Sequence, residues 1–568
     1  MRVKEERRGS VVQVNKMKVE DIIKKIISET LDISIEEVHL DFPTNSRFGD
    51  LTSNSAMVVG KKKNIDPMKL AGQIVKNINL AKDEYVVEAT RIVPGFVNII
   101  FDKKYFDEEL QKIITDDTYG ENSHVKGYKI AIEYTDPNPF KEFHIGHLVP
   151  SSIGESISRL TELCGAEVSR MNYQGDKGLH VAMAVYGMMH EGGNMDNAKD
   201  LGRAYAYGAK ANAEDENAKI EIQRINKVIY EESDNAIMSH YRKGREISLQ
   251  YFEGLYEKLG TKFNEYFFES ETGPVGAGLV REFLRTNVFE ESEGAIIYRG
   301  ENHGLHNRVF INKEGLPTYE AKELGLAKVK YERFPYDLSL VITANEVKEY
   351  FRVLLSAMGQ VLPELAKKTK HIGHGVLRLP TGKMSSRTGS VISALSLIED
   401  VKEKIKSFEK EEQDEKTREM IAIASIKYSI LKYAVGKDMV FDIEKSVSLE
   451  GDSGPYLQYS AVRANKIIKD AKEKSLEARI GKSNLIRQVE SLLVRFPSVV
   501  YISARDSAPQ KLVTYLTELA GAFNNFYANE KVFDESEESP HKLAVVIAFH
   551  KVMSKGLYAL GIQIPEKM

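Results

Sequence analysis

Two short motifs with paired histidines are the residues of this chain best suited to bind a nucleotide. One is "KEFHIGHLVP", with His144 and His147, and the other is "TKHIGHGVLR", with His371 and His374. An imidazole can donate a hydrogen bond to a phosphate oxygen in either protonation state. Identical letters need not make equivalent sites, so the elements around each copy decide which of them binds phosphate.

The first copy lies between an expected strand, "KIAIEY", and a helix that we expect to begin near Leu148. Pro150 fits the first turn of such a helix, where its missing N–H costs nothing. The histidines then stand at or just before a helix N-terminus, where free amide groups and the helix dipole favour phosphate. Gly146 has no side chain to keep a base from its backbone. We therefore predict that His144, Gly146 and His147 bind ATP.

The second copy precedes a glycine-flanked basic loop instead of a helix. "HIGHGVLRLP" has the pattern of an extended segment, and "TGKMSSRTGSVIS" follows it. Basic groups in such a loop can close over a triphosphate and balance the charge that develops as pyrophosphate leaves. We expect His371 and His374 to form only the lead-in to this loop. The candidate side chains of the loop are Lys383, Ser385, Ser386 and Arg387.

The elements around the first motif follow the pattern of an α/β domain at residues 125–395. "YKIAIEY", "SSIGESISRLTELCG" and "AEVSRMNY" predict a strand, a helix and a strand. Such a βαβ unit predicts a doubly wound parallel sheet of the Rossmann type. The charged residues of about 196–260 predict a helical insertion in this domain. Strand-like pieces return in "GAIIYRG", "RVFINKEGLPTYE" and "DLSLVITA".

Two further domains flank the α/β domain. At residues 18–118, "VEDIIKKIISETL" and "KLAGQIVKNI" have helical spacing, and "YVVEATRIV" and "GFVNIIF" have the composition of strands, which together predict a small α/β domain. Residues 1–17 form a polar tail without the apolar core of a signal peptide. Residues 400–568 are nearly all amphipathic helix, which predicts an all-α bundle.

The composition is that of an ordinary globular protein, with 42% hydrophobic and 29% charged residues. The formal charge of −4 does not indicate a polyanionic partner, although local basic patches can exist on an acidic body. Cys164 is the only cysteine, which excludes an intramolecular disulfide and a zinc site built on several thiolates. No run approaches the roughly 18 apolar residues of a membrane span. We predict a cytoplasmic protein without membrane association and without a protein-bound metal.

A HIGH motif followed by a KMSKS-type loop is the pair of signatures of the class I aminoacyl-tRNA synthetases. The wider pattern resembles the arginyl-tRNA synthetase family in particular, from about residue 18 to the last residue. The segments that carry this resemblance are "RFGDLTSNSAM", "EYTDPNPFKEFHIGH", "MNYQGDKG", "PTYEAKELGLA", "GDSGPYLQYSAVRANKI", "FNNFYANEKV" and "GLYALGIQIPEKM".

The resemblance implies a two-step reaction. L-arginine attacks the α-phosphate of ATP, giving arginyl adenylate and pyrophosphate, and the terminal ribose of tRNA(Arg) then takes the arginyl group. Mg²⁺ enters with ATP, and activation requires bound tRNA. The resemblance makes 125–395 the catalytic domain, 18–118 an additional tRNA-binding domain and 400–568 the anticodon-binding domain. We expect the protein to act as a monomer.

Site residues follow from the resemblance position by position. A guanidinium needs carboxylate partners, and Glu133 and Glu323 fall at acidic positions of the family. Asn138 would bind the polar backbone end of arginine, and Tyr319 would line the pocket. The alternative for Tyr319, a core tyrosine, stays open at this point.

Several positions depart from the family pattern. The fourth residue of the KMSKS-type loop is Ser386, where a lysine normally stabilises the transition state. Arginyl enzymes with such a degenerate loop carry a compensating lysine just before the first histidine, and Lys141 stands there. We hypothesise that Lys141 supplies the missing charge, with Lys383 and Arg387 assisting. Other departures are Glu323 for aspartate, Val347 for glutamine and Lys177 for tryptophan, which fit a divergent branch.

Three other functions are weighed against this one. A class I synthetase for another amino acid is disfavoured by paired acids at Glu133 and Glu323, which do not suit an apolar substrate. A catalytically impaired tRNA-binding paralogue is suggested by Ser386, but the presence of His144, His147, Lys141 and the predicted pocket acids speaks against such decay. A dinucleotide oxidoreductase would need G-x-G-x-x-G at the first helix, whereas "GPVGAG" at 273–278 lies far downstream and predicts an ordinary turn before the helix "LVREFL".

Overall fold

The structure, a computed structural model, describes residues 19–43, 48–192, 195–380, 392–409, 412–481, 487–534 and 536–568. The chain divides into two compact units. Unit 1 comprises Met1–Asp117, Leu476–Arg495 and Val532–Ala548, and unit 2 comprises Thr118–Ser475, Phe496–Lys531 and Phe549–Met568. Within the described ranges no helix is long and apolar enough to cross a membrane.

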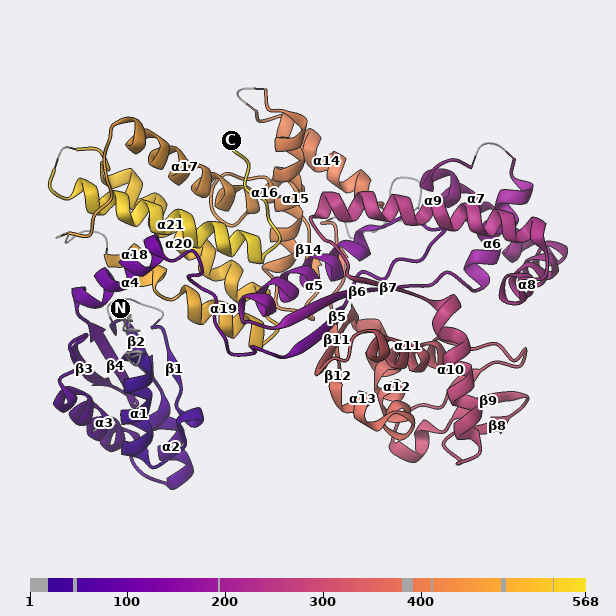
Figure 1. Ribbon diagram of the computed structural model, residues 1–568, viewed down its shortest axis with the longest axis horizontal. Helices are drawn as coiled ribbons and strands as arrows, with labels where there is room; N and C mark the ends of the chain where they lie inside the picture. Colours follow the sequence, from indigo (N-terminus) through magenta and orange to yellow (C-terminus); the bar gives the residue numbers. More distant parts are fainter. Residues whose placement is uncertain are drawn as a thin grey trace, which may run out of the picture. The chain divides into compact units, whose positions relative to one another are not determined.

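Unit 1 is built on a four-stranded antiparallel sheet in the order β1-β2-β4-β3 (Figure 1). The predicted helices and strands of this region are confirmed, and the carboxylate of Asp66 caps α3 by accepting a hydrogen bond from the Met68 amide (3.0 Å). The core contains Ile23, Ile74 and Ile99. The elements are α1 (Val19–Leu31), β1 (Leu40–Asp41), β2 (Leu51–Ser53), α2 (Ser55–Lys63), α3 (Pro67–Ala81), β3 (Val86–Ile92), β4 (Phe96–Phe101), α4 (Lys103–Thr115) and α18 (Arg487–Leu493).

Unit 2 contains a five-stranded parallel sheet in the order β12-β11-β5-β6-β7. The chain begins this sheet at β5, extends it on one side through β6 and β7, and returns to the other side of β5 for β11 and β12. This is the predicted doubly wound topology, and its direction changes between β5 and β11. The strands are β5 (Lys129–Glu133), β6 (Glu167–Gln174), β7 (Glu265–Phe268), β11 (Leu338–Ala344) and β12 (Thr369–His374).

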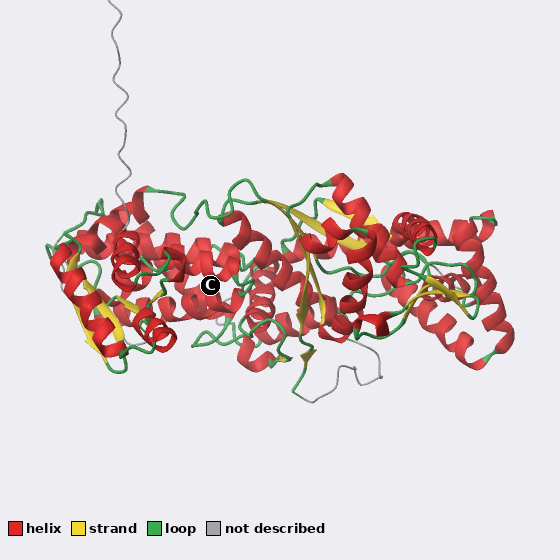
Figure 2. Ribbon diagram, turned by 90° about the horizontal axis from the view of Figure 1, so that it is seen from below, coloured by secondary structure: helices red, strands yellow, loops and turns green. Residues whose placement is uncertain are grey.

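Helices lie on either side of the parallel strands (Figure 2). α5 (Ile145–Leu163) contacts β5, β6 and β11, and its predicted apolar face is buried. On the other face α11 (Tyr319–Arg333) packs Leu326 and Val329 against Met171 and Phe267 of the sheet. Cys164, at the end of α5, is buried as predicted, and burial raises the pKa of its thiol.

The predicted helical insertion follows the first helix after β6. Its helices pack around a core that includes Leu201, Ile222 and Ile237. A second excursion, between β7 and β11, holds a small antiparallel sheet in the order β10-β9-β8. The elements are α6 (Leu179–His190), α7 (Ala198–Glu214), α8 (Glu216–Glu231), α9 (Asn235–Leu259), α10 (Glu269–Leu284), β8 (Glu290–Ser292), β9 (Ala295–Tyr298) and β10 (Arg308–Ile311), with α12 (Lys348–Val361) and α13 (Pro363–Lys368) after β11.

The prediction of a turn at "GPVGAG" is wrong, because residues 273–278 lie inside α10. The glycines there allow α10 and α11 to approach closely. A Cβ on Gly276 would lie 1.7 Å from the carbonyl oxygen of Ala321, and one on Gly325 would lie 2.0 Å from that of Thr272. The sequence pattern could not distinguish a glycine that turns the chain from one that faces another helix.

Replacing Gly276 by alanine should destabilise the protein by about 1–3 kcal/mol, because the two helices must separate to admit the new methyl group. The same change should also displace α11, and with it Tyr319 and Glu323, which this helix carries. Gly278→Ala is the matched control, because Gly278 lies in the same helix and a Cβ there meets nothing within 4 Å. Urea unfolding followed by circular dichroism measures both variants, and equal stability of the two would contradict this packing account.

The C-terminal part of unit 2 is helical, as predicted. α15, α19 and α20 contact α5, the helix that begins within the first HIGH motif. A short parallel pair, β13 (Leu377–Arg378) with β14 (Met439–Val440), was not expected. The helices are α14 (Ala394–Lys406), α15 (Glu415–Leu431), α16 (Ile443–Ser446), α17 (Gly454–Glu473), α19 (Phe496–Arg505), α20 (Pro509–Asn529) and α21 (Ser539–Ala559), the last of which begins in unit 1.

Candidate active site

The candidate site lies at the carboxyl edge of the parallel sheet, where the direction of its topology changes. β5 ends at Glu133, and the chain crosses this edge before it enters α5. Thr135 (φ 81°), Asp136 (φ 43°) and Phe140 (φ 69°) adopt left-handed backbone conformations that non-glycine residues rarely occupy. Ligands of doubly wound folds bind in the crevice at this edge of the sheet. Strained backbone conformations are concentrated at functional sites, so these three residues support the same location.

The histidines of the first HIGH motif form the N-terminus of α5. His144 is the N-cap, and its Nδ1 accepts a hydrogen bond from the Gly146 amide (3.1 Å). Nδ1 of His147 accepts one from the amide of His144 (3.2 Å), which closes a reciprocal capping box. The helix therefore begins at Ile145, three residues before the expected start. Histidine is not a usual capping residue, and Pro150 lies inside the helix instead of in its first turn.

Both imidazoles are poised as neutral donors. Their Nδ1 atoms accept amide hydrogen bonds, so each neutral ring carries its proton on Nε2. Burial lowers the pKa of His144, and Lys141 lowers it further. The pKa of His147 lies well below its ordinary value because of burial, His144 and Lys141. The rings stack 3.8 Å apart, and a Cβ on Gly146 would come within 2.8 Å of the His144 ring.

The chain that leaves the basic loop returns to this motif. The Ile145 amide donates to the Ile392 carbonyl (3.1 Å), and the Ala394 amide donates to the carbonyl of Phe143 (2.8 Å). The histidines and the end of the loop are therefore neighbours. The predicted loop residues Lys383, Ser385, Ser386 and Arg387 lie outside the described residues.

Glu133 is already paired within the protein. It is 2% exposed, and its Oε2 accepts from the Nζ of Lys330 in α11 (2.6 Å), which also donates to Ser339 (3.3 Å). Burial disfavours the charge on Lys330, but Glu133 holds the pKa of this lysine above its ordinary value. Glu133, a predicted partner of the guanidinium, is therefore one half of a buried ion pair.

Glu323 differs from Glu133 in having no partner among the residues that the structure describes. Within the described part of the chain its carboxylate makes no hydrogen bond or ion pair, although it is partly exposed on α11. Burial, followed by the charge of Glu133, raises its pKa to about 8, and Lys330 opposes this shift. A carboxyl group in this condition gains much from a cation that arrives with a ligand.

The remaining predicted pocket residues lie on α11 and in the loop after β5. Tyr319, the first residue of α11, is 59% exposed, so it is not a core tyrosine. Asn138 is half-buried in the loop after β5, and a Cβ on Gly175 would lie 2.3 Å from its Oδ1. The glycine of "MNYQGDKG" is thus needed for close approach of these two loops.

Two buried acids beside the predicted pocket, Glu269 and Asp176, were not predicted from the sequence. Glu269 at the start of α10 is buried and accepts from Lys322 Nζ (2.5 Å); burial raises the pKa of Glu269 in spite of this lysine. Asp176 is fully buried and accepts from the amide (2.8 Å) and hydroxyl (2.7 Å) of Ser270. The acids in "GDKG" and "ESETGP" were a visible signal, but their partners lie 53 and 94 positions away in the chain.

The second HIGH copy is extended, as predicted. His371 and His374 lie on β12, the edge strand of the parallel sheet, and the next described element is the short strand β13. The His371 ring stacks on Phe351 (4.1 Å) and shares a hydrogen bond with the hydroxyl of Thr343 (2.7 Å). These contacts fix it as part of the fold.

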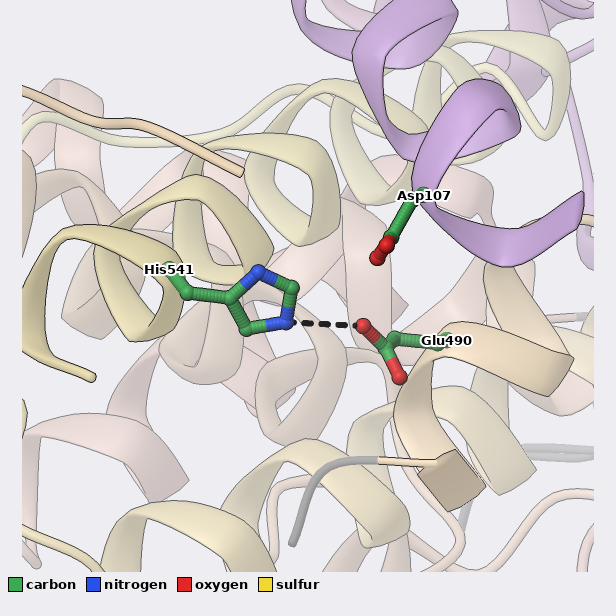
Figure 3. Close-up of side chains that lie close together, drawn as sticks. All are labelled: Asp107, Glu490 and His541. Atoms are coloured by element: carbon green, nitrogen blue, oxygen red, sulfur yellow. Dashed lines mark hydrogen bonds and ion pairs between the residues drawn. The ribbon is translucent and has the colours of Figure 1, made fainter. Parts of the chain in front are cut away.

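One group in unit 1 has the composition of a metal site: Asp107, Glu490 and His541, whose donor atoms lie within 4.8 Å of one another (Figure 3). The Gly481 amide donates to Nδ1 of His541 (3.2 Å), so Nε2 carries the proton and donates to Glu490 (2.9 Å). Asp107 pairs with Lys103. Each of the three side chains is therefore engaged by the protein, as in a polar core.

Comparisons with known proteins agree with this geometry. The family models "tRNA synthetases class I (R), catalytic domain", "DALR anticodon binding domain" and "Arginyl tRNA synthetase N terminal domain" match residues 109–443, 457–568 and 17–101. The chain is 28% identical to the arginine--tRNA ligase of Treponema denticola, covering 90% of this chain and 91% of the relative, and 27% identical to that of Borreliella burgdorferi, covering 97% and 99%.

Its fold is similar to that of the solved Thermus thermophilus arginyl-tRNA synthetase, with a TM-score of 0.80 and 21% identity over 97% of this chain and 100% of that chain. The catalytic-domain model alone spans more than half of the chain. The chain therefore belongs to the class I arginyl-tRNA synthetase family.

Proposed function

We propose that the crevice at the end of β5 activates L-arginine with ATP and transfers it to tRNA(Arg), with Glu323 as the receptor of the guanidinium group. Family membership supports the reaction, and one observation carries the assignment of the receptor. Glu323 is an acid with a raised pKa and without a partner among the described residues, beside an acid that a lysine already neutralises. A guanidinium would supply the missing charge and two parallel hydrogen bonds.

The other residues shape the pocket around Glu323 and set the electrostatic field within it. Tyr319 lines the entrance, and Asn138 receives the α-amino and carboxylate end of arginine. Glu133 acts mainly through Lys330, because their ion pair fixes the floor of the pocket and the charge of Glu133 raises the pKa of Glu323. A site built for a guanidinium rejects neutral amino acids, since its acid would remain unpaired.

MgATP is the second substrate. The Nε2–H groups of His144 and His147 are suited to donate to phosphate oxygens, and Gly146 keeps the surface between them open. A carboxylate oxygen of arginine attacks the α-phosphorus, and the bond to the departing pyrophosphate breaks. Lys141 stabilises the charge that accumulates on the leaving group, and Lys383 and Arg387 assist it, with Ser385 and Ser386 contacting the phosphates.

In this proposal the two domains that flank the catalytic domain bind the tRNA. Residues 18–118 bind the body of the tRNA, residues 400–568 bind its anticodon, and residues 125–395, with the insertion at about 196–260, perform the chemistry. The matches to an anticodon-binding model and to the arginyl N-terminal model support this division.

The experiment that tests the function is ATP–pyrophosphate exchange with each of the twenty amino acids, with and without total tRNA. We expect exchange with arginine alone, and only when tRNA is present. Exchange with another amino acid would overturn the substrate assignment. Tight tRNA binding without any exchange would favour the impaired paralogue.

A further inference from the structure

We infer that the helical insertion holds Lys141 in its working position, and that Tyr205 of α7 is the positioning residue that fixes its ammonium group. The inference rests on the proposed role of Lys141 and goes beyond it, because it gives the insertion a part in the chemical step. The contacts that anchor the residues on either side of Lys141 support it.

The residue before Lys141 belongs to the insertion's core. Phe140 is fully buried and packs in the same cluster as Leu201 and Ile237. Its amide donates to the Ser248 hydroxyl of α9 (2.8 Å), and a Cβ on Gly244 of the same helix would lie 2.2 Å from its ring. The left-handed backbone of Phe140 is thus held by α9 on both its polar and its apolar side.

The residues after Lys141 are anchored in the same way. Phe143 is fully buried, and its ring packs against those of Phe252 and Tyr256 of α9 (centroids 6.2 and 6.4 Å apart). A Cβ on Gly202 of α7 would lie 3.2 Å from Cγ of Glu142, so α7 lies directly on this segment. Lys141 therefore projects from a short stretch of chain that is clamped between two helices of the insertion.

Tyr205 completes this arrangement. The Nζ of Lys141 lies 4.8 Å from the centroid of the Tyr205 ring. The ring is half-buried and packs against the insertion core, so its own position is fixed. An ammonium on a four-carbon stem has many rotamers, and an aromatic face selects among them by its negative electrostatic potential.

The charge of Lys141 also reaches the nucleotide-binding motif. It contributes to the lowered pKa values of His144, His147 and His180, so the ammonium lies near these rings. Tyr205 therefore holds the cation beside the residues that are proposed to bind phosphate.

The test is a double-mutant cycle between Lys141→Ala and Tyr205→Leu, read as kcat of arginine-dependent pyrophosphate exchange with saturating tRNA. Tyr205→Phe keeps the aromatic face and should stay within about twofold of the native kcat. Tyr205→Leu should lower kcat about tenfold with an unchanged KM for arginine. In the double variant, Tyr205→Leu should not lower kcat below that of Lys141→Ala alone, because the ammonium group that Tyr205 positions is absent. Tyr207→Leu, on the same helix and 42% exposed, is the control and should have no effect.

If Tyr205→Leu unfolds the insertion, phenylalanine analogues with one to three ring fluorines at position 205 provide a second test. Fluorine weakens the negative potential of the aromatic face at nearly constant side-chain volume, so kcat should fall stepwise with each added fluorine. Equal kcat across that series, or independent losses in the cycle, would overturn the inference while leaving the role of Lys141 intact. An undiminished kcat in Lys141→Ala alone would instead remove the proposed role of Lys141, and the inference with it.

Discussion

Lys141→Ala lowers kcat of arginine-dependent pyrophosphate exchange by about 10²–10³-fold, with little change in the KM for arginine. The magnitude is typical of removing one preorganised group that stabilises charge in the transition state. The physical reason is that Ser386 cannot balance the departing pyrophosphate, whereas Lys141 is held beside His144 and His147. An interaction made only in the transition state changes kcat and leaves ground-state binding unchanged.

Two further variants make this prediction specific. Lys210→Ala removes a lysine of the same insertion that is exposed and only loosely paired with Glu214 (3.9 Å), and it should leave exchange unchanged. Ser386→Lys in the Lys141→Ala background restores a lysine at the usual position of the loop, and it should recover most of the lost rate. Native exchange in Lys141→Ala would show that the charge comes from elsewhere.

Glu323→Gln raises the KM for arginine and lowers kcat/KM by about 10³-fold, while the KM for ATP stays near its native value. Removing one partner of a buried charge pair costs about 2–5 kcal/mol, and about 4 kcal/mol corresponds to this factor. Glutamine keeps the size of the side chain and loses only its charge. Initial rates over a range of arginine concentrations measure the effect.

Other carboxylates provide the comparison for this variant. Glu332→Gln, on the same helix but exposed and paired with Lys328, should be neutral. Glu323→Asp keeps the charge and should retain a substantial part of the activity. If Glu133→Gln abolished arginine binding with the fold intact while Glu323→Gln did not, the two acids would have to exchange roles.

The sequence was sufficient for features that depend on local pattern. The spacing of Ile153, Ile157 and Leu160 predicted positions of α5 that are buried, and the pattern around the first HIGH copy predicted a strand before it and a helix at its end. The extended second copy followed from the lack of any helical pattern after it. Each of these conclusions used neighbours within about twenty positions.

Features that depend on distant partners could not be predicted. The pairing of Glu133 with Lys330 joins residues 197 positions apart, and nothing local to either residue indicates it. The glycines of α10 serve the close approach of α11, and the sequence pattern predicts a turn there because their partner lies on another helix. The start of α5 was misplaced because His144 caps it with a side chain rarely used for capping.

The central claim, that Glu323 receives the guanidinium group, predicts a change in protonation. A carboxyl with a pKa of about 8 is mostly protonated at pH 7, and arginine binds its charged form. The proton must leave as the guanidinium arrives, so affinity rises with pH and levels off above about pH 8. Burial and Glu133 cause the raised pKa, so the effect should vanish in Glu323→Gln.

Calorimetric titration of arginine at pH 7, in two buffers of different ionisation enthalpy, measures this proton directly. We predict net proton release when the native protein binds arginine, and none attributable to this site in Glu323→Gln. Tight arginine binding without proton release at pH 7, equal in the two proteins, would contradict the assignment of Glu323.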